Sequence, residues 1–305
     1  MAGMNIEQMI YAQGVFCYFI GGDHLDLSLV DGVRQILAPL AAGISTRTQH
    51  SGRSLKVTVT HEAGTDRAPI FEQLKNFARE KELACAIYPD RAASPEFKVA
   101  LMDMDSTLIN EEVIEELAEF AGVRAHVAKV TKLAMEGKLD FQQALRERVK
   151  LLTGQPESIL DTVYTDRITE TGGLREMIAG FKKLGIRTAV VSGGFGAIVD
   201  RFAVKIGLDH SRANILEVVD GKLTGNVAGA IVDADVKRQM LSELCEQYRA
   251  PLGDTIAIGD GANDLKMMQA SGLGVAFCAK PIVQEQAHAA INRRRLDDVL
   301  LLMDE

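Results

Sequence analysis

From Phe97 onward, short apolar runs of strand type alternate along the sequence with longer segments of helical periodicity. The four clearest strands are predicted at Lys98–Met102, Ile186–Val191, Thr255–Ile258 and Gly274–Phe277. Strands that are separated by helices pair in parallel, because a parallel pair needs a crossover connection. The pattern therefore predicts an α/β fold built on a doubly wound parallel sheet.

Between Thr107 and Gly172 this alternation stops, and helical segments follow one another without a strong strand between them. These helices are predicted at residues 111–120, 124–136, 141–152 and 156–164. We expect a helical cap over about 110–172, inserted directly after the first strand of the sheet. Such an insert lies over the carboxyl ends of the strands, where open α/β sheets bind ligands.

The first part of the chain has a different order of elements, which predicts a separate α+β domain over residues 1–90. The order is βαββαβ, with elements predicted at residues 15–20, 26–40, 44–49, 55–60, 70–81 and 83–88. Two prolines and several small polar residues follow in YPDRAASPEF, which indicates a linker at 91–97. The domain that carries the parallel sheet would then span 98–305.

Composition narrows the classes of partner. The net charge is −8, so we expect no nucleic-acid partner, and no apolar run approaches the length of a membrane span. The cysteines lack CxxC or zinc-ligand spacing, which predicts buried, reduced thiols; they are Cys17, Cys85, Cys245 and Cys278. The sequence starts without a charged segment and apolar run of secretory type, so we expect a cytoplasmic protein.

Two carboxylates, Asp103 and Asp105, directly follow the first apolar strand in the sequence KVALMDMDSTLI. Carboxylates are costly in apolar surroundings unless something pairs with them. The D-x-D pattern alone is weak, because a second copy, Asp233-Ala-Asp235, is interpreted as the cap of a helix. The position of the first copy is more informative, since residues i and i+2 leave a strand on the same side.

Three further features follow in order. Ser192 and three nearby glycines end the second strand, where glycine lets backbone amides approach an anion; an ordinary strand-to-helix turn is the alternative. Neither a Walker loop nor G-x-G-x-x-G occurs, which disfavours nucleotide kinases and dinucleotide binding. Lys237 lies on a predicted helix, where most lysines are simply solvated. Asp260 ends a third apolar strand, and Asn263 and Asp264 follow it, where Asn263 could equally cap a helix.

If the parallel sheet forms, four carboxylates converge: Asp103, Asp105, Asp260 and Asp264. They would repel one another unless a divalent cation lay among them, and a set of oxygen ligands favours Mg²⁺ over zinc. An aspartate can attack phosphorus to form an acyl-phosphate. Lys237 and the metal would neutralise the transferring phosphoryl group, and Asp105 is placed to act as the general acid and base.

The motifs DMDST, VSGG, Lys237 and GDGAND occur in the order found in the haloacid dehalogenase superfamily, which residues 97–305 resemble. The stretches DMDSTLINEE, EGKLDFQQALRERV and VSGGF are similar, more narrowly, to the phosphoserine phosphatases of that superfamily. The resemblance implies a Rossmann-like core and Mg²⁺-dependent hydrolysis of O-phosphoserine to serine and phosphate. It also implies an aspartyl-phosphate intermediate and a role as the last step of serine biosynthesis.

The same resemblance implies a role for each residue of the core. Asp103 would be the nucleophile and Asp105 the acid and base. Mg²⁺ would be held by the Asp103 carboxylate, the backbone carbonyl of Asp105 and Asp260, with Asp264 supporting these ligands. The residues that it assigns to phosphate binding are Ser192, Gly193, Lys237 and Asn263.

In the cap, the resemblance implies that Glu112 binds the substrate amine and Arg148 its carboxylate, while Met135 and Phe141 line a closing lid. Physical chemistry agrees, because phosphoserine carries an ammonium and a carboxylate on one carbon. Periodicity cannot single out Glu112 among the glutamates of EEVIEELAEF, however. Met104 departs from the family, which usually has phenylalanine there.

The N-terminal domain resembles the ACT family of amino-acid-binding modules through IGGDHLDLSLVDGV. Asp26 stands where that family often has glycine. Two roles stay open for this domain: binding of an amino acid, or pairing of two subunits as a homodimer.

Two other functions compete with hydrolysis of phosphoserine. A signalling receiver also accepts phosphate on an aspartate beside a lysine, but it needs neither an acid two residues further on nor a helical insert. A phosphotransferase that passes phosphate to an alcohol such as homoserine, or a broader phosphatase that also accepts phosphothreonine, is not separated by the sequence.

Overall fold

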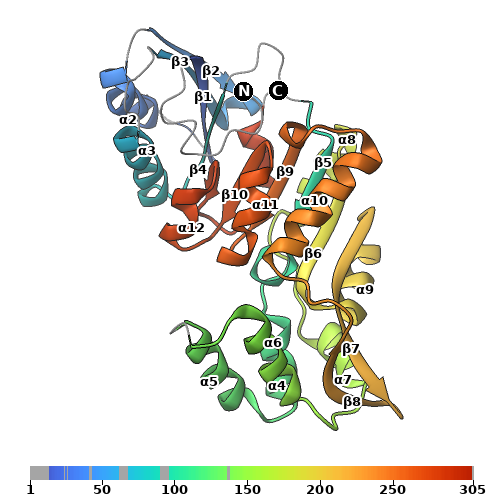
Figure 1. Cartoon of the computed structure of the whole chain (residues 1–305). Coiled ribbons are helices and arrows are strands. Elements are labelled where there is room, and N and C mark those ends of the chain that lie inside the picture. Colours follow the sequence, from blue (N-terminus) through green and yellow to red (C-terminus); the bar gives the residue numbers. More distant parts are fainter. Residues whose placement is uncertain are drawn as a thin grey trace. The chain divides into compact units, whose positions relative to one another are not determined.

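The computed structural model describes residues 14–23, 25, 27–40, 43–61, 68–89, 96–135 and 138–303. The chain divides into two compact units (Figure 1). Unit 1 takes its described residues from 1–101, 172–187 and 241–305. Unit 2 takes them from 102–171 and 188–240.

Unit 1 begins with the N-terminal module, residues 14–89, whose elements follow the expected βαββαβ order. They are β1 (Gly14–Gly21), α2 (Leu27–Leu37), β2 (Gly43–Gln49), β3 (Ser54–His61), α3 (Ala68–Glu80) and β4 (Ala84–Pro89). The strands pair antiparallel in the order β2-β3-β1-β4. The helices α2 and α3 lie side by side (Figure 1). Ile70, Leu74 and Ala78 form the buried stripe of α3, at the spacing of one helix face.

The rest of unit 1 continues this sheet. Its elements are β5 (Val99–Met102), α8 (Leu174–Lys183), β9 (Thr255–Gly259), α11 (Leu265–Ala270), β10 (Leu273–Phe277), α12 (Pro281–Gln286), β11 (Ala289–Ile291) and the 3-10 helix η6 (Leu296–Leu302). β11, β10 and β9 are parallel neighbours, and β11 pairs antiparallel with β4. The strands β9 and β10 are buried along their whole length, as expected for a parallel sheet covered on both faces.

The strands β5 and β9 are neighbours in the sheet and start together, since the Lys98 amide donates to the Asp254 carbonyl at 2.8 Å. Neighbouring strands that start side by side run in the same direction. Both therefore end at the same edge of the sheet.

Unit 2 contains the helical insert and the strands that follow it. Its elements are the π-turn η3 (Met104–Leu108), α4 (Val113–Phe120), α5 (Arg124–Met135), α6 (Phe141–Lys150), α7 (Ile159–Asp166), β6 (Arg187–Phe195), α9 (Gly196–Ile206), β7 (His210–Val219), β8 (Lys222–Ala228) and α10 (Ala234–Tyr248). The first residue of β6 and the end of α10 belong to unit 1, and the last residue of β5 belongs to unit 2. β6 and β7 are parallel, and β7 and β8 antiparallel. The predicted α/β class with a mostly parallel core sheet is confirmed.

The hairpin of β7 and β8 is absent from the strands predicted from sequence. Its turn is Asp220-Gly221, with φ of 48° and 70°, and Val219 pairs with Lys222 across it. Two consecutive residues with positive φ form the hairpin turn that Asp-Gly favours. The dipeptide is thus a usable signal, but β7 carries polar residues among its apolar ones, and these hide its strand character.

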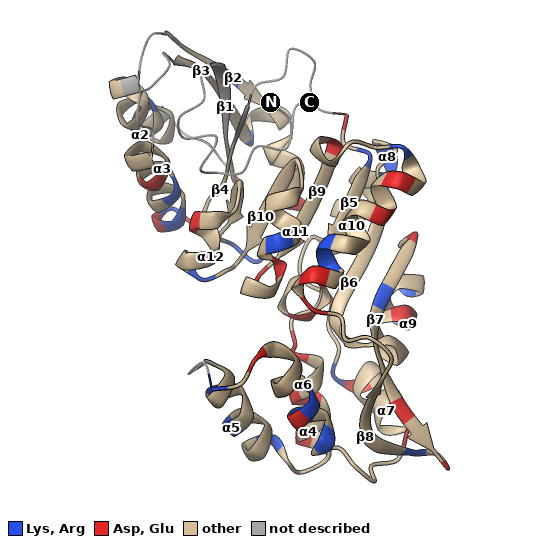
Figure 2. Ribbon diagram, in the orientation of Figure 1, with Lys and Arg blue, Asp and Glu red and all other residues tan. Residues whose placement is uncertain are grey.

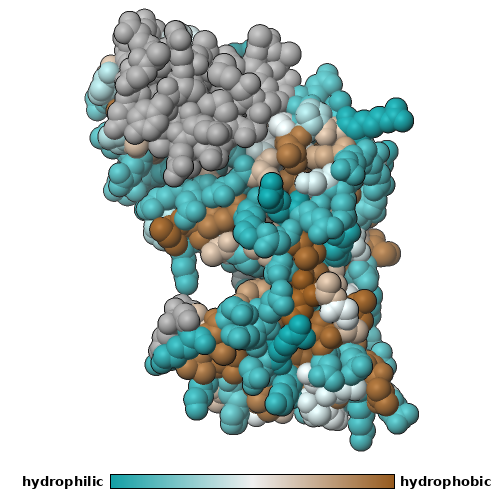
Figure 3. Space-filling model, viewed as in Figure 1, coloured by the Kyte–Doolittle hydropathy of each residue, from teal (hydrophilic) through white to brown (hydrophobic). Residues whose placement is uncertain are grey.

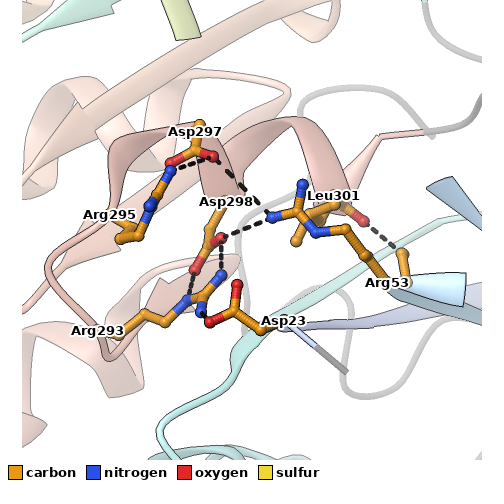
Figure 4. Close-up of polar contacts among 8 residues, drawn as sticks. Asp23, Arg53, Arg293, Arg295, Asp297, Asp298 and Leu301 are labelled. Carbon is orange, nitrogen blue, oxygen red and sulfur yellow. Dashed lines mark hydrogen bonds and ion pairs between the residues drawn. The ribbon is translucent and has the colours of Figure 1, made fainter. Parts of the chain in front are cut away.

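A network of ion pairs joins the N-terminal module to the segment INRRRLDD, whose run of charges indicates a solvated surface when only the sequence is considered. Figure 4 shows Arg293 between Asp298 and Asp23, with an N–O distance of 2.6 Å in its second contact to Asp298. Arg53 lies 3.9 Å from Asp298 and 4.0 Å from Asp297. The side chain of Asp298 is fully buried, so the expectation of a solvated surface is wrong for this carboxylate.

The burial of the apolar residues and of the cysteines agrees with the sequence in part. Among the coloured residues of Figure 3, hydrophilic ones cover much of this face, with apolar patches between them. Large apolar side chains that are exposed include Val204 and Ile215. Cys85 and Cys245 are buried as predicted, but Cys278 is exposed; the side chain of Cys17 lies outside the described residues. Among the described helices, none combines the length and hydropathy required to cross a bilayer.

Candidate active site

The turn after β5 holds both carboxylates of the first D-x-D. Asp103 is buried, and its carboxylate accepts the Met104 amide at 2.8 Å, which caps the π-turn. Ser106 adopts φ of 55° inside that turn, and the Ile109 amide closes it on the Met104 carbonyl at 3.1 Å. Asp105 accepts the Val113 amide at 3.3 Å, so the start of α4 is held against this carboxylate.

Lys237 is an ion-pair partner of Asp103. Its ammonium lies 2.8 Å from the carboxylate, and the two side chains are 0% and 7% exposed. The interpretation of this lysine as a solvated helix residue is therefore wrong. Asp233 caps the helix, since its carboxylate accepts the amides of Asp235 at 3.0 Å and Val236 at 3.1 Å. The second D-x-D thus has the capping role expected for it, and it sets where the helix that carries Lys237 begins.

The Ser192 loop, residues 192–194, ends β6 beside Asp105. The Ser192 hydroxyl is buried and accepts the Gly194 amide at 2.8 Å. A Cβ atom on Gly194 would lie 3.5 Å from both carboxylate oxygens of Asp105. A Cβ atom on Gly193 would lie 3.2 Å from the ring of Phe141. A side chain at Gly193 would therefore crowd Phe141, the first residue of α6, whereas a Cβ atom on Gly194 would make only ordinary contact with Asp105.

Glu112 and Arg148 occupy the cap side of the same region. The Ser106 hydroxyl donates to Glu112 at 2.7 Å. Burial raises the pKa of the Glu112 carboxyl, while Ser106, Arg148 and Lys237 oppose this shift. Burial likewise lowers the pKa of Arg148, against the charges of Glu112 and Asp105. The two cap residues thus lie close enough to each other and to the turn after β5 to interact electrostatically.

The charged residues of the cap helix α4 are all acidic, whereas α6 carries both signs of charge (Figure 2). The two predicted lid residues are Phe141 and Met135. Phe141 lies beside the Ser192 loop, because a Cβ atom on Gly193 would lie 3.2 Å from its ring, whereas the side chain of Met135 lies outside the described residues. Sequence reasoning missed Gln142, whose amide donates to the Asp233 carboxylate at 2.8 Å. This contact joins the first turn of α6 to the cap of the Lys237 helix.

Unit 1 carries the remaining predicted residues after β9. The carboxylate oxygens of Asp260 and Asp264 lie within 4.8 Å of each other. Asp264 is fully buried and accepts the Gly261 amide at 3.1 Å, which fixes its orientation. Asn263 lies between them in sequence, and it does not cap α11, which begins at Leu265 after Asp264. Two neighbouring carboxylates of this kind offer the oxygen ligands that Mg²⁺ prefers.

Comparison with known proteins gives a consistent picture. Residues 97–272 match a family model described as haloacid dehalogenase-like hydrolase. A phosphoserine phosphatase of Streptomyces coelicolor is 50% identical over 206 residues, which are 68% of this chain and 50% of that protein. The match thus spans half the length of this relative.

Two solved structures are similar as well. A HAD family hydrolase from Salmonella enterica serovar Typhi has a TM-score of 0.81 and 30% identity, covering 95% of this chain and 99% of that one. A structure described as the phospho-aspartyl intermediate analogue of phosphoserine phosphatase has a TM-score of 0.64 and 46% identity. It covers 68% of this chain and 99% of that chain.

Proposed function

The chain belongs to the haloacid dehalogenase-like hydrolase family, and from this premise we propose that it is a phosphoserine phosphatase. It hydrolyses O-phosphoserine to serine and inorganic phosphate. The observation that carries the proposal is the buried contact of Asp103 with Lys237 beside the oppositely charged cap pair of Glu112 and Arg148. The first pair suits a phosphoryl group, and the second suits an amino acid.

In the proposed reaction, an oxygen of Asp103 forms a bond to phosphorus while the bond from phosphorus to the serine oxygen breaks. Protonated Asp105 gives its proton to that leaving oxygen. Asp105 then takes a proton from water, whose oxygen bonds to phosphorus as the bond to Asp103 breaks. Lys237 and the donors of the Ser192 loop hold the other phosphoryl oxygens throughout.

We propose Mg²⁺ as the cofactor, bound by the Asp103 carboxylate, the Asp105 backbone carbonyl and Asp260, with Asp264 orienting this set. The donors are all oxygens, which fits a hard divalent cation. Within unit 1, the carboxylates of Asp260 and Asp264 support the assignment, since an oxygen of one lies within 4.8 Å of an oxygen of the other. When bound, the ion would neutralise charge that develops on the phosphoryl group.

The cap pair defines the proposed substrate. Glu112 would accept hydrogen bonds from the ammonium of phosphoserine, and Arg148 would donate to its carboxylate. Ser192, Gly193, Lys237 and Asn263 would bind the phosphate, and Met135 and Phe141 would close the lid over it. A phosphorylated sugar offers neither charged group, so it would lose both cap interactions.

The experiment is a panel of phosphomonoesters assayed for released phosphate with Mg²⁺ and with a chelator. We expect O-phosphoserine to be hydrolysed with the highest kcat/KM and chelation to abolish turnover. Hydrolysis of sugar phosphates at a higher kcat/KM would overturn the substrate assignment. Full activity in the chelator would overturn the metal assignment. Transfer of phosphate to added homoserine in preference to water would instead favour the phosphotransferase alternative.

We further propose that this reaction completes serine biosynthesis in the cytoplasm and that residues 1–90 form an ACT-like domain. The βαββαβ order of the N-terminal module supports the second statement. Its role is amino-acid binding or pairing of two subunits. Light scattering with and without serine separates these roles, because pairing alone gives a dimer whose stability is independent of serine.

A further inference from the structure

Asn214 uses both ends of its side-chain amide inside unit 2. This residue of β7 is 1% exposed. Its nitrogen donates to the Gly193 carbonyl at 2.8 Å, and its oxygen accepts the Val232 amide at 2.8 Å. A buried amide is costly unless it is satisfied, and here each end binds a main-chain group of a different segment.

The first of these bonds orients the Ser192 loop. In a trans peptide the carbonyl and the following N–H point in opposite directions, so fixing the Gly193 oxygen also fixes the Gly194 N–H. That N–H donates to the Ser192 hydroxyl at 2.8 Å. The hydroxyl has one proton to donate, and because it accepts from Gly194 this proton stays available for a phosphate oxygen.

The second bond holds the beginning of the helix that carries Lys237. Val232 immediately precedes Asp233, the capping residue of α10. The Lys237 amide donates to the Asp233 carbonyl at 2.9 Å, so the lysine lies one turn from this cap. A change in the position of Val232 would therefore move the cap and the lysine together.

We propose that Asn214 is a positioning residue for phosphate, holding the Ser192 loop and the Lys237 helix at a fixed separation. The inference rests on the proposed phosphatase function. Asn214 does not touch the substrate; it acts through Ser192, Gly194 and Lys237. Loss of the Asn214 side chain should lower kcat/KM for every phosphomonoester to the same degree, because Ser192, Gly194 and Lys237 contact only the phosphate group.

The principal variant is Asn214→Asp, which keeps the size and the acceptor for Val232. At neutral pH its carboxylate cannot donate to the Gly193 carbonyl and repels it. We expect kcat/KM to fall at least about tenfold for phosphoserine and for an aryl phosphate alike, with weaker inhibition by inorganic phosphate. The matched control is Asn226→Asp on β8, where the amide donates to Glu217 on the surface. This control should stay within about twofold of wild type on both measures.

The pH profile separates positioning from general destabilisation. When it is protonated, the carboxyl group introduced by Asn214→Asp can donate to the Gly193 carbonyl as the asparagine amide does. The ratio of variant to wild-type kcat/KM should therefore rise as pH falls. A merely structural defect would instead lower the unfolding temperature without this recovery. A folded Asn214→Asp variant whose kcat/KM and phosphate inhibition stay within about twofold of wild type would overturn the proposal.

A second measurement uses only the wild-type chain, so it tests the inference even if Asn214→Asp does not fold. In the wild-type chain with isotope-labelled asparagine, saturation with inorganic phosphate should shift the side-chain amide resonances of Asn214 and leave those of Asn226 in place. Unchanged Asn214 resonances at saturation would overturn the inference. Failure of the proposed function is distinguishable, since it requires that the wild-type chain itself hydrolyses no phosphoserine.

Discussion

The ammonium of Lys237 lies 2.8 Å from the carboxylate of Asp103, and neither side chain has appreciable access to water. A buried pair of this kind gains little net stability, because both charges lose hydration, but removal of one partner leaves a costly isolated charge. The two residues therefore depend on each other before any substrate binds. A phosphate group that enters beside them gives the lysine a second anionic partner.

Replacement of Asp103 by asparagine should abolish turnover, because an amide cannot form the acyl-phosphate. It should also lower the unfolding temperature, because Lys237 loses its buried counter-charge. Steady-state assays and thermal denaturation measure the two effects. Substantial retained hydrolysis would contradict the role of Asp103 as nucleophile.

Arg148→Ala should be selective for the substrate. We expect kcat/KM for phosphoserine to fall about a hundredfold, which corresponds to loss of charged hydrogen bonds to its carboxylate, and kcat/KM for an aryl phosphate to change little. Arg146→Ala on the same helix is the control, because that side chain is exposed. Equal losses on both substrates would argue against recognition of the carboxylate.

Glu112→Gln should separate affinity from stability. Burial raises the pKa of the Glu112 carboxyl. The stability that the neutral form contributes is present at low pH and is lost as pH rises through the raised value. Glutamine stays neutral, so the variant should unfold at a higher temperature than wild type at pH 7, with a gap that narrows in acid. Its KM for phosphoserine should nevertheless rise. A lower unfolding temperature for the variant at pH 7 would contradict this account.

Gly193→Ala should disturb the lid, because the added methyl group would lie 3.2 Å from the Phe141 ring, closer than usual contact. We expect a several-fold loss of kcat/KM, and a smaller loss when Phe141→Leu makes room. The double-mutant cycle should show coupling of about 0.5 kcal/mol or more, since the added methyl group would meet the ring. If the effects of the two substitutions on kcat/KM were strictly additive, the Phe141 ring would not be the cause of the loss in Gly193→Ala.

Lys75→Met should destabilise the folded chain, because it removes the hydrogen bonds that join α3 to the end of α12. The Lys75 ammonium donates to the carbonyls of Gln284 at 2.8 Å, Glu285 at 3.2 Å and Ala287 at 2.9 Å. Loss of the common donor should cost about 3 kcal/mol in the free energy of unfolding. The exposed Lys81→Met is the control. Urea denaturation measures both, and a cost for Lys75→Met no larger than for the control would contradict the role of this lysine.

The same variant tests a pH dependence. Burial lowers the pKa of Lys75 to about 8. Between this value and the ordinary lysine pKa of 10.5, the unfolded chain binds more protons than the folded chain. The free energy of unfolding that Lys75 contributes therefore rises with pH across this range, and it is lost as pH falls through about 8. The advantage of wild type over Lys75→Met should therefore be larger at about pH 9.5 than at pH 7. An advantage that shrinks with pH would exclude this cause.

Much of the core was predictable because its signals are local. The apolar strands, the four cap helices and the aspartates at the strand ends follow from periodicity and from residue order. Asp233 could be recognised as a cap for the same reason. The resemblance added the roles of Glu112 and Arg148, which no pattern on α4 or α6 distinguishes from neighbouring charges.

What could not be predicted depends on contacts between distant segments. Asn214 has no local signal, because its partners, Gly193 and Val232, come close only after β6, β7 and the start of α10 assemble. The aspartates of INRRRLDD look solvated until Arg53 and Asp23 reach this segment from the N-terminal module. Burial of a charge is a property of its neighbours and is invisible in its own sequence.

The pairing of β4 with β11 has a consequence for anyone who trims this protein. A truncated chain that starts after residue 96 would lack β4, so β11 (Ala289–Ile291) would become an exposed, uncharged edge strand with unpaired backbone amides and carbonyls. Such an edge strand can pair with the same strand of a second molecule and so promote aggregation. A truncated enzyme would therefore need a substitution to lysine or proline in that strand to stay monomeric.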